Sequence, residues 1–195
     1  MKKKLIFASL IALIIAVLAI AGLWIGLKMY IETPLPAGGD FTLQSVNGPR
    51  SLKSFAGKEV VLYFGYTSCP DACPTSLSHL AEVFGKLSAD QRAQIVPVFI
   101  SVDSRADTPQ KADDYAKFFF KNDGVGLTGT KTAIDQVVKQ YGTSYSFVED
   151  KTSALGYTVE HGNDFYFIDR KGRLRAIAPT LASDQQLLDD LKSLL

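Results

Sequence analysis

Two cysteines separated by three residues are the part of this 195-residue sequence best suited to chemistry. Cys69 and Cys73 lie in the segment TSCPDACP, where Pro70 and Pro74 restrict the chain. A helical pattern follows, and the positive end of a helix dipole lowers the pKa of a cysteine at its N-terminus. The pair therefore suits a structural disulfide, a redox-active dithiol, a peroxide-reducing thiol or a soft-metal site. A disulfide closing so short a loop contributes only about 2 kcal/mol, which disfavours a purely structural role.

A metal site at the cysteines needs a further ligand, and the sequence has only two histidines. His161 stands in the segment YTVEHGN before a predicted strand, which predicts a loop position at the edge of a sheet. Two thiolates and an imidazole suit Cu(I), and the same set holds Cu(II) when a weaker fourth donor is added. The pattern alone leaves open whether His161 is a ligand or a solvated or packed side chain. His79 follows Cys73 by six residues and is expected on another face of the helix, at the surface.

The elements that must position these residues follow from hydrophobic periodicity. Continuous β-branched and aromatic runs predict buried strands at 59–66, which leads into TSCPDACP, and at 95–102. Further strands are predicted at 164–169 and 174–178, with a hairpin around Asn47 and Gly48. One helix is predicted with Pro74 in its first turn and apolar residues at helical spacing as far as Leu87. Other helices are predicted from Thr108 and Pro109 to about Phe120, from Thr130 to Gly142, and after a capping box of Ser183 and Gln186. This order predicts an α/β sandwich of thioredoxin type, with helices packed on a mixed sheet.

The N-terminus is predicted to be a membrane anchor. Three lysines, residues 2–4, precede an apolar run at residues 5–27, which at about 1.5 Å per residue is long enough to cross a hydrocarbon core of about 30 Å. Trp24 and Lys28 are typical of the membrane interface, and the lysine cluster is expected on the cytoplasmic side. The alternative is a cleaved signal peptide, which would leave an exposed apolar tail on the mature protein.

Charge separates the anchor from the rest of the chain. The 21 basic and 20 acidic residues give a net charge of +1, but four of the basic residues and none of the acidic ones lie in the predicted anchor at 1–28. A linker predicted at 29–40 and a single domain predicted at 41–195 then carry 17 basic against 20 acidic residues, a net charge of −3. The domain has no basic surface typical of nucleic-acid binding, and the sequence contains no P-loop or GxGxxG fingerprint for a nucleotide.

With these residues in view, the sequence resembles the SCO/SenC family, membrane-anchored copper proteins that assist assembly of the binuclear copper site of cytochrome c oxidase. The resemblance runs from about Phe41 to the C-terminus and includes TSCPDACP, FISVD, VGLTGT, YTVEH and DFYFID. It implies a thioredoxin-like fold with an added hairpin, and it implies that Cys69, Cys73 and His161 bind copper as Cu(I), Cu(II) or both. No catalytic residue is predicted, apart from the cysteine pair as the redox-active group if the protein is a reductase.

Three acidic residues near these motifs have no assigned role. The family commonly has Pro and then Arg in the stretch after the aspartate that matches Asp103, whereas this chain has SRA at residues 104–106. Glu160 stands before the histidine, where aspartate is common. Asp71, between the cysteines, is expected to face solvent rather than the metal. Neither departure removes a predicted ligand.

The sequence favours a copper carrier over a general disulfide oxidoreductase. The cysteine spacing differs from CxxC, and no proline occurs between Pro109 and Pro179 to supply the cis-proline of thioredoxin-like oxidoreductases. We predict a copper chaperone in a bacterial inner membrane, with its domain in the periplasm, that serves the copper-accepting subunit of cytochrome c oxidase and depends on periplasmic thiol reductants. A thiol-disulfide reductase for the acceptor cysteines, and a redox or copper sensor, are the alternatives; only the reductase would be an enzyme.

Overall fold

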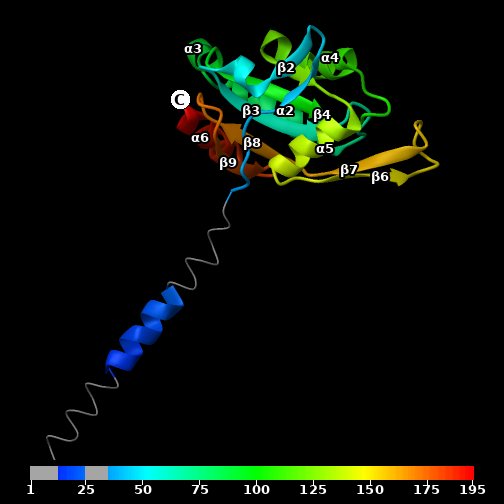
Figure 1. The fold of residues 1–195 in the computed structure, drawn as a ribbon. Coiled ribbons are helices and arrows are strands. Elements are labelled where there is room, and N and C mark those ends of the chain that lie inside the picture. Colours follow the sequence, from blue (N-terminus) through cyan, green and yellow to red (C-terminus); the bar gives the residue numbers. More distant parts are fainter. Residues whose placement is uncertain (1–12, 25–34) are drawn as a thin grey trace, which may run out of the picture. The chain divides into compact units, whose positions relative to one another are not determined.

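The computed structural model describes residues 13–24 and 35–195 of a chain that divides into two compact units, Met1–Pro34 and Leu35–Leu195 (Figure 1). In the first unit, residues 13–24 are helical and their apolar side chains are exposed. Within these described ranges, no helix has both the length and the apolar character needed to span a membrane. The predicted span at 5–27 and the predicted linker at 29–40 lie partly outside the described residues, so the anchor stays a prediction.

A five-stranded sheet with strand order β5-β4-β3-β8-β9 forms the centre of the second unit (Figure 1). β3, β4 and β5 are parallel, whereas β8 is antiparallel to both β3 and β9. The strands of this sheet are β3 (Glu59–Gly65), β4 (Ile95–Ser101), β5 (Val125–Leu127), β8 (Asp164–Ile168) and β9 (Leu174–Pro179). Two separate hairpins are β1 (Thr42–Ser45) with β2 (Gly48–Ser51), and β6 (Tyr145–Glu149) with β7 (Tyr157–His161).

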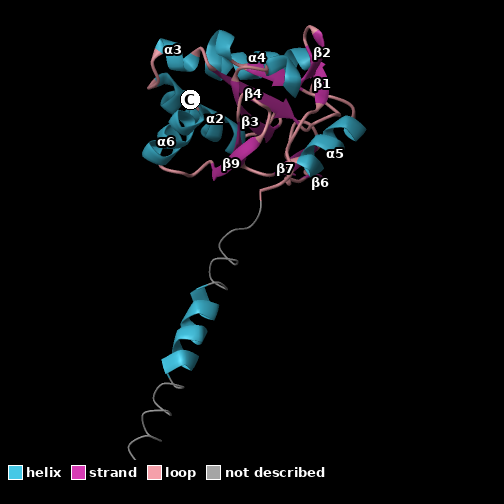
Figure 2. Cartoon of the chain, turned by 60° about the vertical axis from the view of Figure 1, so that its left-hand side comes forward, coloured by secondary structure: helices cyan, strands magenta, loops and turns pink. Residues whose placement is uncertain are grey.

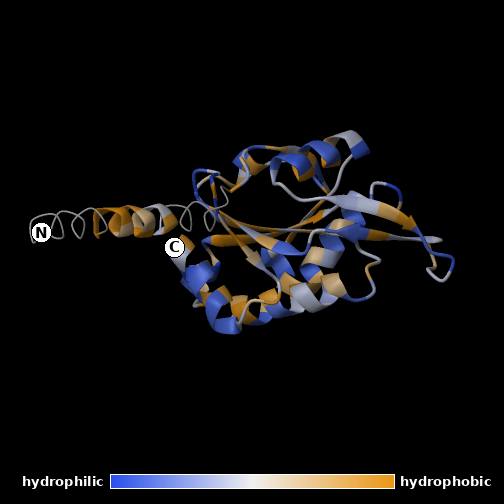
Figure 3. Cartoon of the chain, turned by 90° about the horizontal axis from the view of Figure 1, so that it is seen from below, coloured by the Kyte–Doolittle hydropathy of each residue, from blue (hydrophilic) through white to orange (hydrophobic). Residues whose placement is uncertain are grey.

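Helices connect these strands and pack against the sheet (Figure 2). They are α2 (Ala72–Gly85), α3 (Ala89–Arg92), α4 (Pro109–Phe120), α5 (Lys131–Gln140) and α6 (Asp184–Leu194), with short 3₁₀ helices η1 (Leu52–Phe55) and η2 (Lys121–Asp123). The hydrophobic strands lie between more hydrophilic helical layers (Figure 3). The predicted α/β sandwich with a mixed sheet is confirmed, and so is the hairpin around Asn47 and Gly48.

The central strand β3 divides the core into two layers. All seven of its residues are buried, and successive side chains point to opposite faces of the sheet. Tyr63 packs beside Phe165, with ring centroids 5.6 Å apart, whereas the ring of the next residue, Phe64, lies 6.0 Å from that of Tyr141. Tyr63, Phe64 and Tyr66 are all buried in the core.

Helix caps follow the sequence signals with one exception. The side chains of Thr108 and Thr130 accept hydrogen bonds from the third residue of α4 and α5, as predicted. At α6, the Ser183 hydroxyl accepts from the N–H of Gln186, but the Gln186 side chain donates to Asp190 instead of returning to the cap. The predicted capping box is therefore only half formed, because a carboxylate one turn later competes for the amide.

Candidate metal centre

Cys69 and Cys73 lie where β3 passes into α2. The helix begins at Ala72, so Pro74 lies in its first turn, as predicted, where N–H groups have no helical partner and a proline is tolerated. Cys73 is fully buried and Cys69 is partly exposed. The N–H of Cys73 donates to Sγ of Cys69 across 3.4 Å. The N-terminus of α2 therefore supports charge on the Cys69 sulfur, as the sequence predicted.

A buried carboxylate fixes the loop that carries Cys69. Asp107 accepts hydrogen bonds from the N–H of Thr67 at 2.8 Å, from its hydroxyl at 2.5 Å and from the hydroxyl of Ser101 at 2.5 Å. These bonds tie the start of the TSCPDACP loop to the end of β4. Sequence reasoning missed this role because Thr67 and Asp107 are 40 residues apart.

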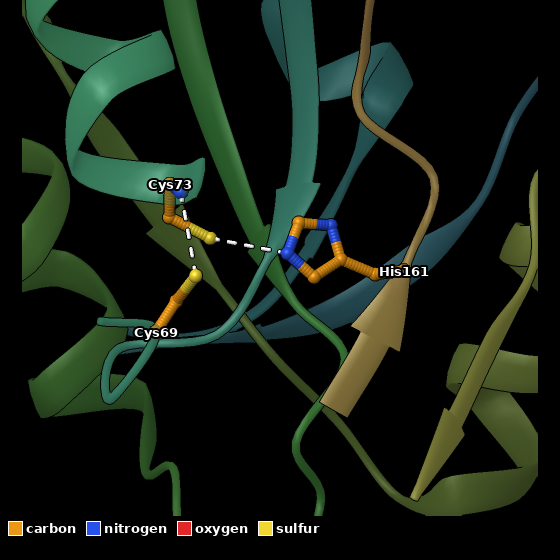
Figure 4. Close-up of side chains that lie close together, drawn as sticks. All are labelled: Cys69, Cys73 and His161. Atoms are coloured by element: carbon orange, nitrogen blue, oxygen red, sulfur yellow. Dashed lines mark hydrogen bonds between the residues drawn. The ribbon is translucent and has the colours of Figure 1, made fainter. Parts of the chain in front are cut away.

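His161 reaches the cysteines from a different sheet. It is the last residue of β7, which pairs with β6, so the predicted loop position is wrong. Its Nε2 lies 3.3 Å from Sγ of Cys73 (Figure 4). Its Nδ1 lies 2.9 Å from the carbonyl oxygen of Gly162. When protonated, Nε2 donates to the sulfurs; when neutral, the ring keeps its proton on Nδ1, because a carbonyl oxygen can only accept, and the lone pair of Nε2 faces the sulfurs. This is the tautomer that a metal ligand requires.

Three soft or borderline donor atoms thus converge, one each from Cys69, Cys73 and His161, all within 4.8 Å of one another. Atoms bound to one metal at about 2.0–2.3 Å lie no more than about 4.6 Å apart, so small side-chain movements bring all three onto one ion. Thiolate and imidazole are donors that suit copper. In the described part of the chain, no other group of three His, Cys, Asp or Glu side chains is placed to hold a metal.

The two thiols differ in acidity. A hydrogen bond from Cys73, assisted by His161, lowers the pKa of Cys69 against the opposing effect of burial. The same bond and burial raise the pKa of Cys73. Burial acts to lower the pKa of His161, but its hydrogen bonds to Cys69 and to Gly162 raise that pKa overall. Cys69 is therefore the thiolate of the pair, and a metal ion must displace the proton of Cys73.

Two tyrosine rings and an asparagine surround the imidazole. The rings of Tyr63 and Tyr66 lie edge-on to His161, with centroids 6.2 and 5.9 Å away. Asn163 accepts hydrogen bonds from the hydroxyl of Tyr63 at 2.6 Å and from that of Ser76 at 3.1 Å, which joins β3, α2 and the segment before β8. No cis peptide bond occurs in the described residues.

The other residues that the sequence singled out lie outside this cluster. His79 was expected at the surface but is only partly exposed, because its ring nitrogens lie 3.1 Å from the carbonyl oxygen of Thr180 and 3.0 Å from Asp184. Asp71 is exposed, as expected, and Glu160 is exposed as well. None of these side chains belongs to the converging set.

Gly65, the last residue of β3, lies directly against the Cys73 sulfur. A Cβ at this position would stand 2.6 Å from Sγ of Cys73 and 3.1 Å from the rings of Tyr63 and Phe99. Gly65→Ala must therefore displace the thiol, and we expect it to lower copper affinity about 10-fold or more in a competition assay with a Cu(I) chelator.

Gly85→Ala is the matched control, because nothing lies within 4 Å of a Cβ at Gly85, the last residue of α2. It should leave copper affinity unchanged and keep or slightly increase stability, since alanine is the better helix former. Equal copper affinity in Gly65→Ala and the wild type would contradict this packing of Cys73.

Comparison with known proteins decides the family. The family model of SCO1/SenC matches residues 31–195, which is most of the sequence. The chain belongs to the SCO1/SenC family. Among its relatives in this family, a SCO2-like protein of Rickettsia felis is 33% identical over 162 residues, which cover 83% of this chain and 78% of the relative. The resemblance seen in the motifs is therefore confirmed.

Solved Sco structures share the fold described above. Apo Sco1 from Thermus thermophilus matches with a TM-score of 0.73 and 32% identity, over 82% of this chain and 92% of its own. ScoI of Arabidopsis thaliana with copper bound matches with a TM-score of 0.71 and 32% identity, over 80% of this chain and 96% of its own. The mixed α/β fold is thus the thioredoxin-like fold of Sco proteins, and the predicted copper site agrees with a copper-bound relative and with the Cys–Cys–His group present here.

Proposed function

We propose that this SCO1/SenC protein is a copper chaperone, which binds one copper ion through Cys69, Cys73 and His161 and delivers it to the binuclear copper site of cytochrome c oxidase during assembly. The observation that carries the proposal is the convergence of two sulfurs and one imidazole nitrogen within 4.8 Å. The three donors come from a loop, a helix and a separate hairpin. Metal binding gives the imidazole a direct role as a ligand, whereas in a dithiol it would only help to lower the pKa of Cys69.

Delivery proceeds as an exchange of ligands. A thiolate of the acceptor forms a bond to copper while a bond from copper to Cys69 or Cys73 breaks, and the freed sulfur takes up the proton that the acceptor thiol releases. Copper keeps its oxidation state, so no electron moves. Cys69 is the more exposed sulfur, which makes it the first to be exchanged at the surface.

The proposal includes an anchor in a bacterial inner membrane and a domain in the periplasm. The apolar run at 5–27 behind three lysines supports this orientation. In an oxidising compartment the two thiols would pair as a disulfide, so periplasmic thiol reductants must reduce them before copper binds.

A thiol-disulfide reductase that prepares the acceptor cysteines is the second candidate. It is favoured by the lowered pKa of Cys69, because a thiolate is the species that attacks a disulfide. Cys73 would then attack the mixed disulfide, which releases a reduced acceptor and leaves an oxidised Cys69–Cys73 pair. Both candidate functions use the same cysteines, but only copper delivery needs His161 as a ligand.

Complementation separates the two functions. The full-length wild type, the Cys69→Ser/Cys73→Ser double variant and His161→Ala are expressed in a bacterial strain that lacks its own SCO1/SenC protein, and the assembled oxidase and its copper content are measured. Delivery predicts that neither variant restores the oxidase. Full assembly with His161→Ala would overturn delivery, and reduction of an acceptor-peptide disulfide by that variant would then assign the reductase function.

A further inference from the structure

The hairpin that carries His161 is not a part of the central sheet. β6 and β7 form a two-stranded sheet of their own, whereas the cysteines follow β3 in the middle of the five-stranded sheet. A two-stranded ribbon has little stability by itself. The short connection from His161 to β8 holds one end of β7 near the central sheet, so the contacts of its other end decide how the strand lies over the cysteines. The contacts at the start of β7 come from the turn after β4.

Asp103 supplies the first of these contacts. Its carboxylate is fully buried and accepts hydrogen bonds from the backbone N–H groups of Arg105 at 2.9 Å and Ala106 at 3.1 Å. The hydroxyl of Tyr157, the first residue of β7, donates to the same carboxylate at 3.0 Å. A buried carboxylate is costly unless it is hydrogen-bonded, so this bond holds Tyr157 firmly against the turn.

Arg105 supplies the second contact. Its guanidinium carbon lies 3.7 Å from the centre of the Phe147 ring, on β6, and 5.3 Å from that of Tyr157, on β7. The two rings are themselves in edge contact, with centroids 5.4 Å apart. One cation therefore spans both strands of the hairpin.

Strand geometry transmits this constraint to the metal centre. Tyr157, Val159 and His161 alternate with Thr158 and Glu160, so they share one face of β7. Val159 is buried between the two ends of this face. β7 is only five residues long, so holding Tyr157 at its start also sets the direction of the strand and the position of the His161 side chain at its end.

We propose that Asp103, Arg105 and Tyr157 act as a clamp that positions His161 for copper. The clamp gives a role to Asp103, for which the sequence alone assigned none, and to Arg105 in the segment SRA at 104–106. The inference rests on the proposed role of His161 as a ligand. Its residues are positioning residues, because none of their side chains belongs to the converging donor set.

A double-mutant cycle tests the clamp with full-length protein. Arg105→Ala and Tyr157→Phe are measured for Cu(II) and Cu(I) affinity, alone and combined with His161→Ala. Each should lose about 10-fold in affinity in the wild-type background and nothing further in the His161→Ala background. Arg50→Ala is the matched control, because Arg50 stacks on Phe55 at 4.3 Å, away from His161; it should leave copper affinity unchanged.

A second measurement, made without copper, tests the clamp independently of whether His161 binds the metal. In reduced apo protein, proton contacts between His161 and the Tyr66 ring are measured by nuclear Overhauser effects, and they should weaken in Arg105→Ala but not in Arg50→Ala. Unchanged contacts in Arg105→Ala would overturn the clamp, as would an equal loss of copper affinity in both backgrounds. If His161→Ala alone leaves copper affinity unchanged, the ligand assignment fails, and the proton contacts alone decide the clamp.

Discussion

A chain with serine at both Cys69 and Cys73 should bind copper more than about a thousandfold more weakly than the wild type, because a single imidazole remains of three converging donors. The fold should survive. Serine is close to cysteine in size, and the main cost is a hydroxyl at buried position 73, about 1–3 kcal/mol in the free energy of unfolding. The measurement is Cu(I) affinity by chelator competition, together with thermal unfolding.

The single variants sharpen this prediction. Cys69→Ser removes the partly exposed thiolate and should leave stability almost unchanged, whereas Cys73→Ser should weaken copper binding and also lower stability. Ser68→Ala, at the exposed neighbouring position, should change neither quantity. Retention of one tightly bound copper ion per chain by the double variant would show that the metal lies elsewhere.

His161→Ala should lower copper affinity about 100-fold, with the larger loss for Cu(II), because this variant removes the nitrogen donor whose lone pair faces the sulfurs. The substitution also opens a space between the rings of Tyr63 and Tyr66. Free imidazole at millimolar concentration should therefore restore part of the Cu(II) affinity, which a general loss of structure would not allow.

The other histidine is the natural control for this variant. His79→Ala breaks the contacts of α2 with Thr180 and Asp184, so it should lower stability by about 1–2 kcal/mol while copper affinity stays at the wild-type value. Equal effects of His79→Ala and His161→Ala on copper would contradict the assignment of the ligand.

The sequence predicts those parts of the fold in which local pattern and burial agree. The buried runs at 59–65 and 95–101 are parallel neighbours in the sheet, as their continuous apolar character indicates. The positions of Cys69 and Cys73 at a strand-to-helix passage follow from the same patterns. The local sequence pattern does not predict the hydrogen bonds of Asp103 with Tyr157 and of Asp107 with Thr67, because the partners are 54 and 40 residues apart in the chain.

The hairpin of β6 and β7, which carries His161, is the main element that the sequence pattern does not predict. β6 alternates half-buried and exposed residues, and β7 has one fully buried residue, Val159, so neither shows the apolar run of a core strand. The resemblance to the family implies an added hairpin, but the sequence pattern predicts a loop, not a strand, at His161. Its place depends on Arg105 and Asp103, which are distant in sequence and whose contacts exist only after folding.

X-ray absorption at the copper edge of the reduced, copper-loaded full-length protein identifies the atoms bound to the metal. We expect one copper ion per chain with two sulfur neighbours and one imidazole nitrogen, and the loss of that nitrogen in His161→Ala but not in His79→Ala. Copper surrounded by sulfur alone, or a spectrum that His161→Ala leaves unchanged, would contradict the assignment of Cys69, Cys73 and His161 as the ligands.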